Sequence, residues 1–183
     1  MKYFKIILIF FLFLLEKTSF ADENIVEILK KEDNIIFIRH AIAPGNGDPL
    51  NFDILDCSTQ RNLSKSGESQ ALKIGKFFEK NDIKISKILS SEWCRCKDTA
   101  KIAFGRYETK DFLNSFYEDR FSKNKDKQIL DFQKFIKNWD YPGNLVLVTH
   151  YVVISEILDL ATSSGEIVIT DNNLKFLGSL EIN

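Results

Sequence analysis

Two histidines, the only ones in the chain, follow two segments of the same design. Residues 34–40 (Asn-Ile-Ile-Phe-Ile-Arg-His) and residues 144–150 (Asn-Leu-Val-Leu-Val-Thr-His) each lead from an apolar stretch into a histidine. Short apolar stretches of this kind are typical of strands in a buried parallel sheet. Ligands bind beyond the carboxyl ends of such strands, so we expect His40 and His150 at one functional edge of the sheet.

Arginines accompany the histidines. Arg39 precedes His40, and Arg95 lies in the first turn of a helix that directly follows a predicted strand. A guanidinium group binds phosphate oxygens through paired hydrogen bonds, and a neutral imidazole can attack phosphorus. The start of the Arg95 helix would also direct backbone amides toward this edge. We therefore expect a phosphate to meet Arg39, Arg95 and oriented amides there.

The remaining pattern alternates strands with helices and contains no repeat, linker or low-complexity region. Helices are predicted at 64–80, 93–104, 125–139 and 151–160, and further strands at 83–89, 165–170 and 176–182. This alternation predicts a single three-layer α/β/α sandwich with a mainly parallel sheet. The last two strands, joined by a turn at 171–173, predict an antiparallel hairpin at the sheet edge.

The first residues predict export. Lys2 and Lys5 precede the apolar stretch 6–15, and Ser19-Phe20-Ala21 offers small residues where a signal peptidase cleaves. We expect a signal peptide at 1–21, a mature domain at 22–183, and a periplasmic or secreted protein. The stretch is short for a membrane span, and the rival interpretation is an uncleaved amphipathic anchor.

The charge of the mature domain excludes some partners. Cleavage removes three lysines and one glutamate from the 25 basic and 26 acidic residues, leaving 22 and 25 and a net charge of −3. Such a domain has no overall electrostatic attraction for nucleic acid or anionic membranes. Any affinity for a phosphorylated ligand must come from a local cluster of cations.

Three cysteines, Cys57, Cys94 and Cys96, would enter an oxidising compartment after export. Cys94 and Cys96 are too close to bridge each other within a helix, so we expect either Cys57–Cys94 or Cys57–Cys96. No Cys-x-x-Cys spacing suggests zinc, and we predict no metal site.

The three pieces together resemble one family. Arg39-His40-Ala41 after a strand, Ser91-x-x-x-Arg95-Cys96-x-x-Thr99-Ala100, and Thr149-His150 after another strand are similar to the histidine phosphatase superfamily, which has the phosphoglycerate-mutase-like fold. Residues 56–67 and 144–150 further resemble a small secreted bacterial branch. The resemblance covers essentially the whole mature chain.

The resemblance implies a role for each matching residue. His40 matches the nucleophile that becomes phosphohistidine, Arg39 and Arg95 match the guanidinium clamps, and His150 matches the second imidazole. It further implies catalysis without a cofactor, because two arginines and a second histidine can neutralise phosphoryl charge. His40 must be neutral to attack, so we expect its other ring nitrogen to donate to a backbone carbonyl.

Three carboxylates are candidates for the general acid that protonates the leaving group. Glu118 and Asp119 follow the second arginine, where the mutase-like branch carries this group, and Asp48 lies in the loop after His40. We favour Glu118, although an acidic pair is commonly a solvated surface feature. Arg61 either contacts substrate or supports the start of the next helix.

The predicted function is a secreted, metal-independent phosphomonoesterase that acts through phosphohistidine. Its substrate would be a small phosphomonoester or, by family analogy, a phosphate of the cell envelope. A protein-phosphohistidine phosphatase shares the compact size. A non-catalytic module that binds phosphate ligands is the alternative from a different class.

Overall fold

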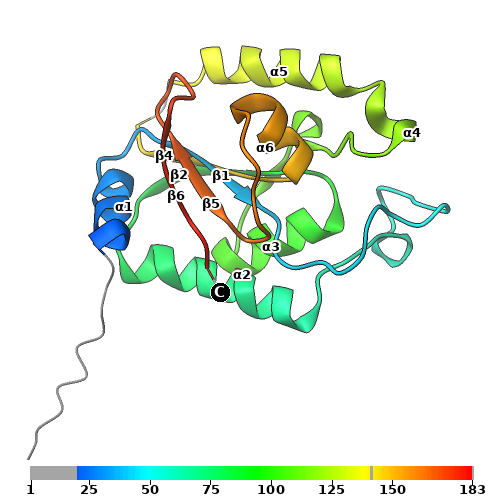
Figure 1. Cartoon of the computed structure of the whole chain (residues 1–183), viewed down its shortest axis with the longest axis horizontal. Coiled ribbons are helices and arrows are strands. Elements are labelled where there is room, and N and C mark those ends of the chain that lie inside the picture. Colours follow the sequence, from blue (N-terminus) through cyan, green and yellow to red (C-terminus); the bar gives the residue numbers. More distant parts are fainter. Residues whose placement is uncertain (1–19, 141, 183) are drawn as a thin grey trace, which may run out of the picture.

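The computed structural model describes residues 20–140 and 142–182 as one α/β domain (Figure 1). Its helices are α1 (Phe20–Lys30), α2 (Lys65–Lys80), α3 (Cys94–Phe104), α4 (Asp119–Ser122), α5 (Lys125–Lys137) and α6 (Tyr151–Leu158). Its strands are β1 (Ile35–Arg39), β2 (Ile85–Ser90), β3 (Glu108–Thr109), β4 (Asn144–Thr149), β5 (Ile167–Thr170) and β6 (Phe176–Leu180).

The six strands form one sheet in the order β3-β2-β4-β1-β5-β6. Strands β1 to β4 are parallel, whereas β5 runs antiparallel to β1 and pairs with β6 as the predicted edge hairpin. The apolar residues of the central strands alternate between two cores. One core joins the sheet to α1, α2 and α3, and the other joins it to α5 and α6 (Figure 1). The predicted three-layer sandwich is therefore confirmed.

The register of the central strands brings the site residues together. Arg39 of β1 pairs with Thr149 of β4, and the backbone N–H of His40 donates to the Thr149 carbonyl at 2.9 Å. On the other side of β4, Ser90 of β2 pairs with Val148. The carboxyl ends of β1, β4 and β2 consequently lie side by side, each followed by a predicted site segment.

Local signals explain the principal helix boundaries. Ser64 caps α2 by accepting the Gly67 N–H at 3.1 Å, as expected, and Gly105 ends α3 in the left-handed conformation. Gly67 is also a point of close approach, because a Cβ there would collide with the carbonyl of Ile42. The start of α2 thus packs directly on the loop that follows His40.

Some elements differ from the sequence expectations. Strand β2 begins two residues later than predicted, at Ile85, and α5 ends at Lys137 rather than residue 139. Helices α1 and α4 and the two-residue strand β3 are additional. Residues 1–19 of the predicted signal peptide lie outside the described residues, and α1 begins at Phe20. Helix α1 contributes Ile25 and Leu29 to the core.

Candidate active site

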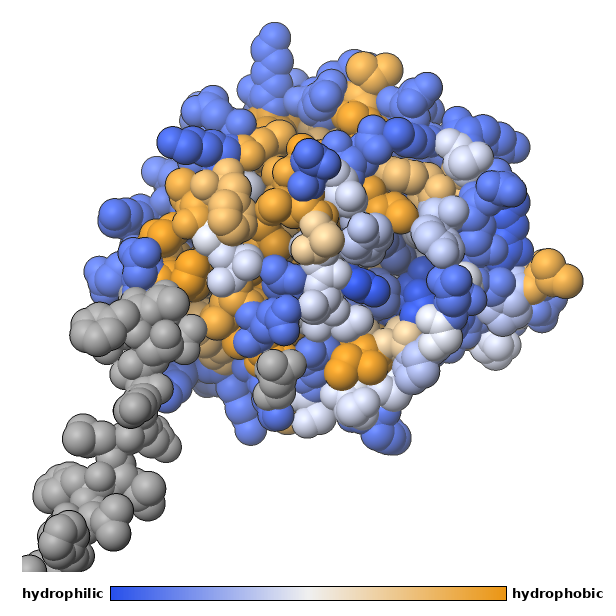
Figure 2. Space-filling model, in the orientation of Figure 1, coloured by the Kyte–Doolittle hydropathy of each residue, from blue (hydrophilic) through white to orange (hydrophobic). Residues whose placement is uncertain are grey.

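A pocket of about 310 Å³ opens at the carboxyl ends of β1 and β4. It brings together all six residues proposed for catalysis or substrate binding, namely Arg39, His40, Arg61, Arg95, Glu118 and His150. Asp48, Ser115, Tyr117 and Tyr151 are among its other lining residues. On the face shown in Figure 2, hydrophobic surface gathers over β5 and β6, whereas the side of the loop between β1 and α2 is mainly hydrophilic.

His40 has the geometry of a neutral nucleophile. Its side chain is buried, and Nδ1 lies 2.8 Å from the carbonyl oxygen of Ala41. A carbonyl only accepts, so Nδ1 carries the proton and Nε2 keeps its lone pair. Burial lowers the pKa of His40 well below its ordinary value, and the charge of Arg95 lowers it further. The expected hydrogen bond to a backbone carbonyl is therefore confirmed.

His150 lies beside His40, with ring centroids 5.5 Å apart. Its Nδ1 is 3.5 Å from Nη2 of Arg95, and its Nε2 is 2.9 Å from Oγ of Ser91. Burial lowers the pKa of His150 well below the ordinary value, and the positive charge of Arg95 lowers it further. Both imidazoles are consequently neutral at pH 7.

Arg95 is held by a buried carboxylate. Its Nη1 donates to Oδ1 and Oδ2 of Asp48 at 2.9 and 3.1 Å, and Trp93 Nε1 donates to Oδ2 at 3.0 Å. The backbone N–H of Arg61 donates to Oδ1 as well. Burial alone would raise the pKa of Asp48, but the charge of Arg95 and these hydrogen bonds bring the pKa below its ordinary value.

The contacts of Asp48 make it a poor candidate for the general acid. The Asp48 carboxylate is occupied by donors and stabilised in its ionised form, which is unsuited to protonating a leaving group. Asp119 is exposed at the start of α4 and is absent from the pocket lining. Glu118 lines the pocket, where Oε1 accepts the Asp48 N–H at 2.9 Å and Oε2 pairs with Arg120 at 2.9 Å. Glu118 thus lines the pocket without contacting Arg95, and its role as the general acid stays a prediction.

Arg39 and Arg61 combine exposure to the pocket with contacts to backbone carbonyls. Arg39 Nη1 donates to Thr162 O at 2.5 Å, and its guanidinium lies over the Tyr151 ring. Arg61 donates from Nε to Gly47 O and from Nη1 to Ala43 O. Arg61 therefore braces the loop after His40 while lining the pocket, and its contact with substrate stays a prediction.

Three backbone amides at the entry to α3, where free amides were expected to face a phosphate, donate to side chains of the protein. The N–H of Glu92 donates to Asn114 Oδ1, that of Trp93 to Ser91 Oγ, and that of Cys94 to Gln60 Oε1. These side chains occupy the amides that would otherwise bind an anion. The cationic character of the pocket rests on its arginines.

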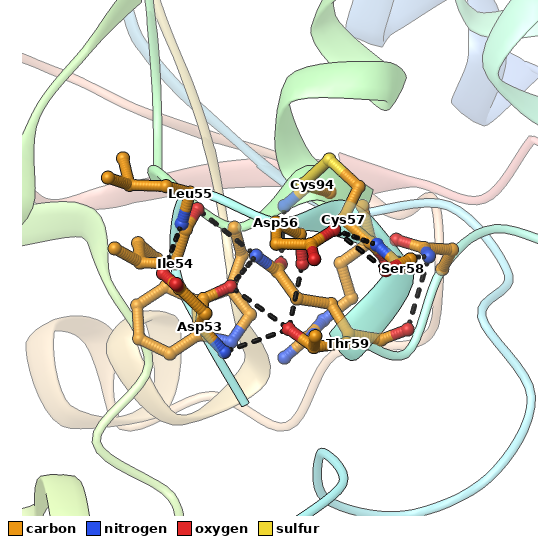
Figure 3. The surroundings of a disulfide bond; sticks show 12 residues. Asp53, Ile54, Leu55, Asp56, Cys57, Ser58, Thr59 and Cys94 are labelled. Atoms are coloured by element: carbon orange, nitrogen blue, oxygen red, sulfur yellow. Dashed lines mark hydrogen bonds between the residues drawn. A yellow bond between two sulfur atoms is a disulfide. The ribbon is translucent and has the colours of Figure 1, made fainter. Parts of the chain in front are cut away.

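A disulfide joins the loop before α2 to the start of α3. Cys57 pairs with Cys94, with 5.7 Å between their Cα atoms, and Cys96 is a free buried thiol (Figure 3). Figure 3 shows the hydrogen bonds that surround it, including Asp53 N–H to Thr59 Oγ1 and Ser58 N–H to Asp56 Oδ1. Of the two pairings expected from the sequence, the structure has Cys57–Cys94.

Several site residues were not identifiable from the sequence. Trp93 donates its indole N–H to Asp48 in addition to packing in the core, and Tyr151 lies beneath the Arg39 guanidinium. Ser91 contacts His150, and Asn114, which no sequence pattern singled out, accepts from Ser91. The position of Ser91 within the Ser-x-x-x-Arg pattern was the available clue.

Two features are absent from residues 20–140 and 142–182, which the structure describes. No group of three or more His, Cys, Asp or Glu side chains there is placed to hold a metal ion. No helix in that part of the chain is long and apolar enough to cross a membrane.

Comparison with known proteins agrees with this geometry. Residues 35–120 match the model of the histidine phosphatase superfamily, branch 1. No curated protein matches the chain. Among solved structures, TTHB049 from Thermus thermophilus has a TM-score of 0.59 and 16% identity, covering 82% of this chain and 96% of its own.

Two other solved structures have the same fold. Phosphoglycerate mutase from Thermus thermophilus has a TM-score of 0.57 and 16% identity over 82% of this chain and 99% of its own. The protein histidine phosphatase SixA, complexed with tungstate, has a TM-score of 0.54 and 11% identity over 81% of this chain and 96% of its own. The family match assigns residues 35–120, which carry His40 and both clamp arginines, to the histidine phosphatase superfamily, and the fold of the whole domain agrees with it.

Proposed function

We propose that this protein is a metal-independent phosphomonoesterase that acts through a phosphohistidine on His40. The observation that carries the proposal is the Nδ1 contact of His40 with the Ala41 carbonyl, which leaves Nε2 unprotonated in an arginine-lined pocket. A buried neutral imidazole with a fixed tautomer is prepared for attack on phosphorus.

The charges around the pocket match a phosphate dianion. Among the residues that line the pocket, Arg39, Arg61 and Arg95 carry three positive charges and Asp48 carries one negative charge, and the proposed acid Glu118 is counted as protonated. The excess of two positive charges equals the charge of a phosphomonoester dianion. Guanidinium groups can stabilise equatorial oxygens in the transition state without a metal ion.

The reaction has two steps. The Nε2 lone pair of His40 attacks phosphorus, the bond from phosphorus to the leaving oxygen breaks, and protonated Glu118 gives its proton to that oxygen. Water then attacks the phosphohistidine and gives a proton to the Glu118 carboxylate while the P–N bond breaks. Phosphate and neutral His40 result, and the same carboxyl group serves as acid and then as base.

The test uses p-nitrophenyl phosphate with EDTA present. We expect turnover in EDTA, and rapid quenching without acid should trap an acid-labile phosphoryl group on His40. His40→Ala should abolish both signals, while Arg39→Ala and Arg95→Ala should each lower turnover by roughly two to four decades. Arg106→Ala, an exposed arginine outside the pocket, is the matched control.

Two outcomes would contradict the proposal. Full activity of His40→Ala, or activity that requires an added divalent ion, would refute the mechanism. Phosphate binding without any turnover would identify the chain as the non-catalytic binding module.

A second candidate is a protein-phosphohistidine phosphatase. The fold similarity to SixA, which extends over 96% of that compact chain, favours it. A phosphohistidine peptide and a panel of sugar phosphates, compared at equal concentration, distinguish the candidates by their ratio of kcat/KM values. Dominant hydrolysis of the peptide would replace the small-molecule proposal.

We also propose export and therefore a phosphomonoester of the cell envelope as the substrate class. The lysine, apolar and Ser-x-Ala pattern of residues 1–21 supports export, as does the Cys57–Cys94 disulfide, which suits an oxidising compartment. Sequencing of the mature N-terminus should start at Asp22 in a periplasmic or secreted fraction. An intact Met1 terminus in the cytosol would refute this.

A further inference from the structure

The inference concerns the second imidazole and begins with the residues behind it. His150 Nε2 has two buried neighbours, Ser91 Oγ at 2.9 Å and Cys96 Sγ at 3.5 Å. Hydroxyl and thiol groups can each donate or accept, so the proton on Nε2 depends on where these groups direct their own protons.

The side-chain amide of Asn114 determines where the Ser91 hydroxyl directs its proton. Asn114 Nδ2 donates to the Glu92 carboxylate at 2.6 Å, and Asn114 Oδ1 accepts the Glu92 N–H at 2.8 Å. A carboxylate only accepts and an N–H only donates, so the amide has one consistent orientation. Its Oδ1 therefore accepts the Ser91 hydroxyl proton at 3.0 Å. The Ser91 oxygen is left to accept from His150.

Cys96 leads to the same result. Burial raises the pKa of its thiol to about 12, so it remains protonated. Its S–H can donate to the carbonyl of Thr149, 3.6 Å away, which leaves the sulfur as an acceptor toward His150. Ser91 Oγ and Cys96 Sγ are thus both acceptors toward His150, so Nε2 must be the donor. In neutral His150 the proton lies on Nε2, and Nδ1 carries the lone pair.

The two histidines are therefore opposite tautomers. His40 is protonated on Nδ1 by its contact with Ala41, whereas His150 is protonated on Nε2. The Nδ1 lone pair of His150 faces Arg95 Nη2 at 3.5 Å at the edge of the pocket. An oxyanion bound by Arg95 would meet a lone pair there, which is repulsive unless Nδ1 gains a proton.

We propose that Ser91 and Asn114 are positioning residues that hold His150 as the Nε2–H tautomer, so that an oxyanion binds together with one proton on His150 Nδ1. Protonation converts Nδ1 from an acceptor into a charged donor to the anion. His40 must stay neutral to attack, which assigns the proton to the second ring. The inference rests on the proposed function in so far as the pocket binds an oxyanion.

The positive charges around His150 explain why this ring gains a proton only when an anion binds. The charged or titratable groups that face His150 come from three parts of the fold: Arg39 and His40 at the end of β1, Arg61 in the loop before α2, and Arg95 and Cys96 on α3. The arginines oppose a further positive charge, and the Asp48 carboxylate is already paired with Arg95. A dianion offsets this repulsion and favours the imidazolium.

The direct test is nitrogen NMR of protein labelled with ¹⁵N-histidine, in which two rings give a simple spectrum. Sulfate is the probe because it stays a dianion from pH 5 to 9. We expect opposite tautomers in the free protein at pH 7.5 and a doubly protonated His150, with His40 still neutral, when sulfate is bound. His150→Gln assigns the two sets of signals. An Nδ1–H tautomer of free His150, or a neutral His150 in the sulfate complex, would overturn the inference.

Calorimetry provides the second measurement. Titration of sulfate in buffers of different ionisation enthalpy should show uptake of about one proton. The affinity for sulfate should fall about tenfold for each unit by which the pH rises, over the range in which binding takes up the proton. Ser91→Ala should reduce both uptake and this slope. Ser90→Ala is the matched control, since buried Ser90 donates to the Ser91 carbonyl and is the residue next to Ser91. Equal slopes in the two variants would refute the role of Ser91.

The outcomes separate this inference from the proposed function. Turnover of p-nitrophenyl phosphate through His40 with a neutral His150 in the sulfate complex would refute the inference alone. Proton uptake with sulfate but no turnover by the wild-type protein would refute the phosphatase proposal and leave the inference standing.

Discussion

Asp48 and Arg95, 47 residues apart in the chain, form an ion pair at 2.9 Å with side chains only 2% and 3% exposed. The pair connects the loop after His40 to the helix that carries the second arginine. It fixes the Arg95 guanidinium beside His150 before any ligand arrives. Preorganised charge of this kind stabilises a transition state without reorganisation during the reaction.

Replacing the carboxylate should therefore damage the fold as well as the site. Asp48→Asn leaves the buried Arg95 charge uncompensated, and we expect a loss of roughly 3–5 kcal/mol in the free energy of unfolding. Urea denaturation measures it, with Asp53→Asn in the exposed part of the same loop as the control. Unchanged stability with a selective loss of activity on poor leaving groups would instead make Asp48 the general acid.

Glu118 should show the leaving-group dependence of a general acid. Glu118→Ala should lower kcat/KM for alkyl phosphates by roughly two to four decades and affect aryl phosphates much less, because phenolate needs little protonation. Asp119→Ala, which changes the exposed neighbour, should leave both rates within a factor of about two. Equal losses on the two substrate types would remove Glu118 from proton transfer.

The sequence predicted the fold because its signals are local. The apolar stretches 35–39 and 144–149, the Ser64 cap and the Gly105 stop each act within a few residues. Helix α1 was not predicted because it follows the apolar stretch that was interpreted as a signal peptide. The pairing of Asp48 with Arg95 and the link from Ser91 to Asn114 depend on tertiary contacts. No spacing in one sequence distinguishes such partners from ordinary polar residues.

The two buried histidines should make stability fall in mild acid. Their pKa values are lowered in the folded protein, so below the unfolded value of 6.5 the unfolded chain binds protons that the native state does not. Between pH 7.5 and pH 5.5 the free energy of unfolding should drop by up to about 1.4 kcal/mol per histidine. Denaturation across this range should show a smaller drop for His40→Gln and His150→Gln. A drop that survives both substitutions would assign it to other groups.

Reduction of the disulfide should weaken both stability and catalysis. The bond closes a 37-residue separation, for which the chain-entropy model gives about 4 kcal/mol. It also joins α3 to the loop that carries Arg61 and Gln60, and Gln60 Oε1 accepts the Cys94 N–H at 2.9 Å. Loss of the bond should loosen the support of Arg95 and lower kcat/KM, in addition to lowering the melting temperature.

The measurement compares the wild-type protein with and without reductant, beside the double variant Cys57→Ser/Cys94→Ser. Cys96→Ala is the control for general effects on thiols, because Cys96 is buried and unbridged. We expect reductant to lower the stability of the wild-type protein and of Cys96→Ala but not of the double variant, which is already at the lower value. Mass spectrometry of the protein from its native envelope should find one free thiol. Three free thiols in that protein would contradict the prediction. A wild-type protein whose stability and kcat/KM do not change with reductant would also contradict it, because the Cys57–Cys94 bond would then contribute to neither.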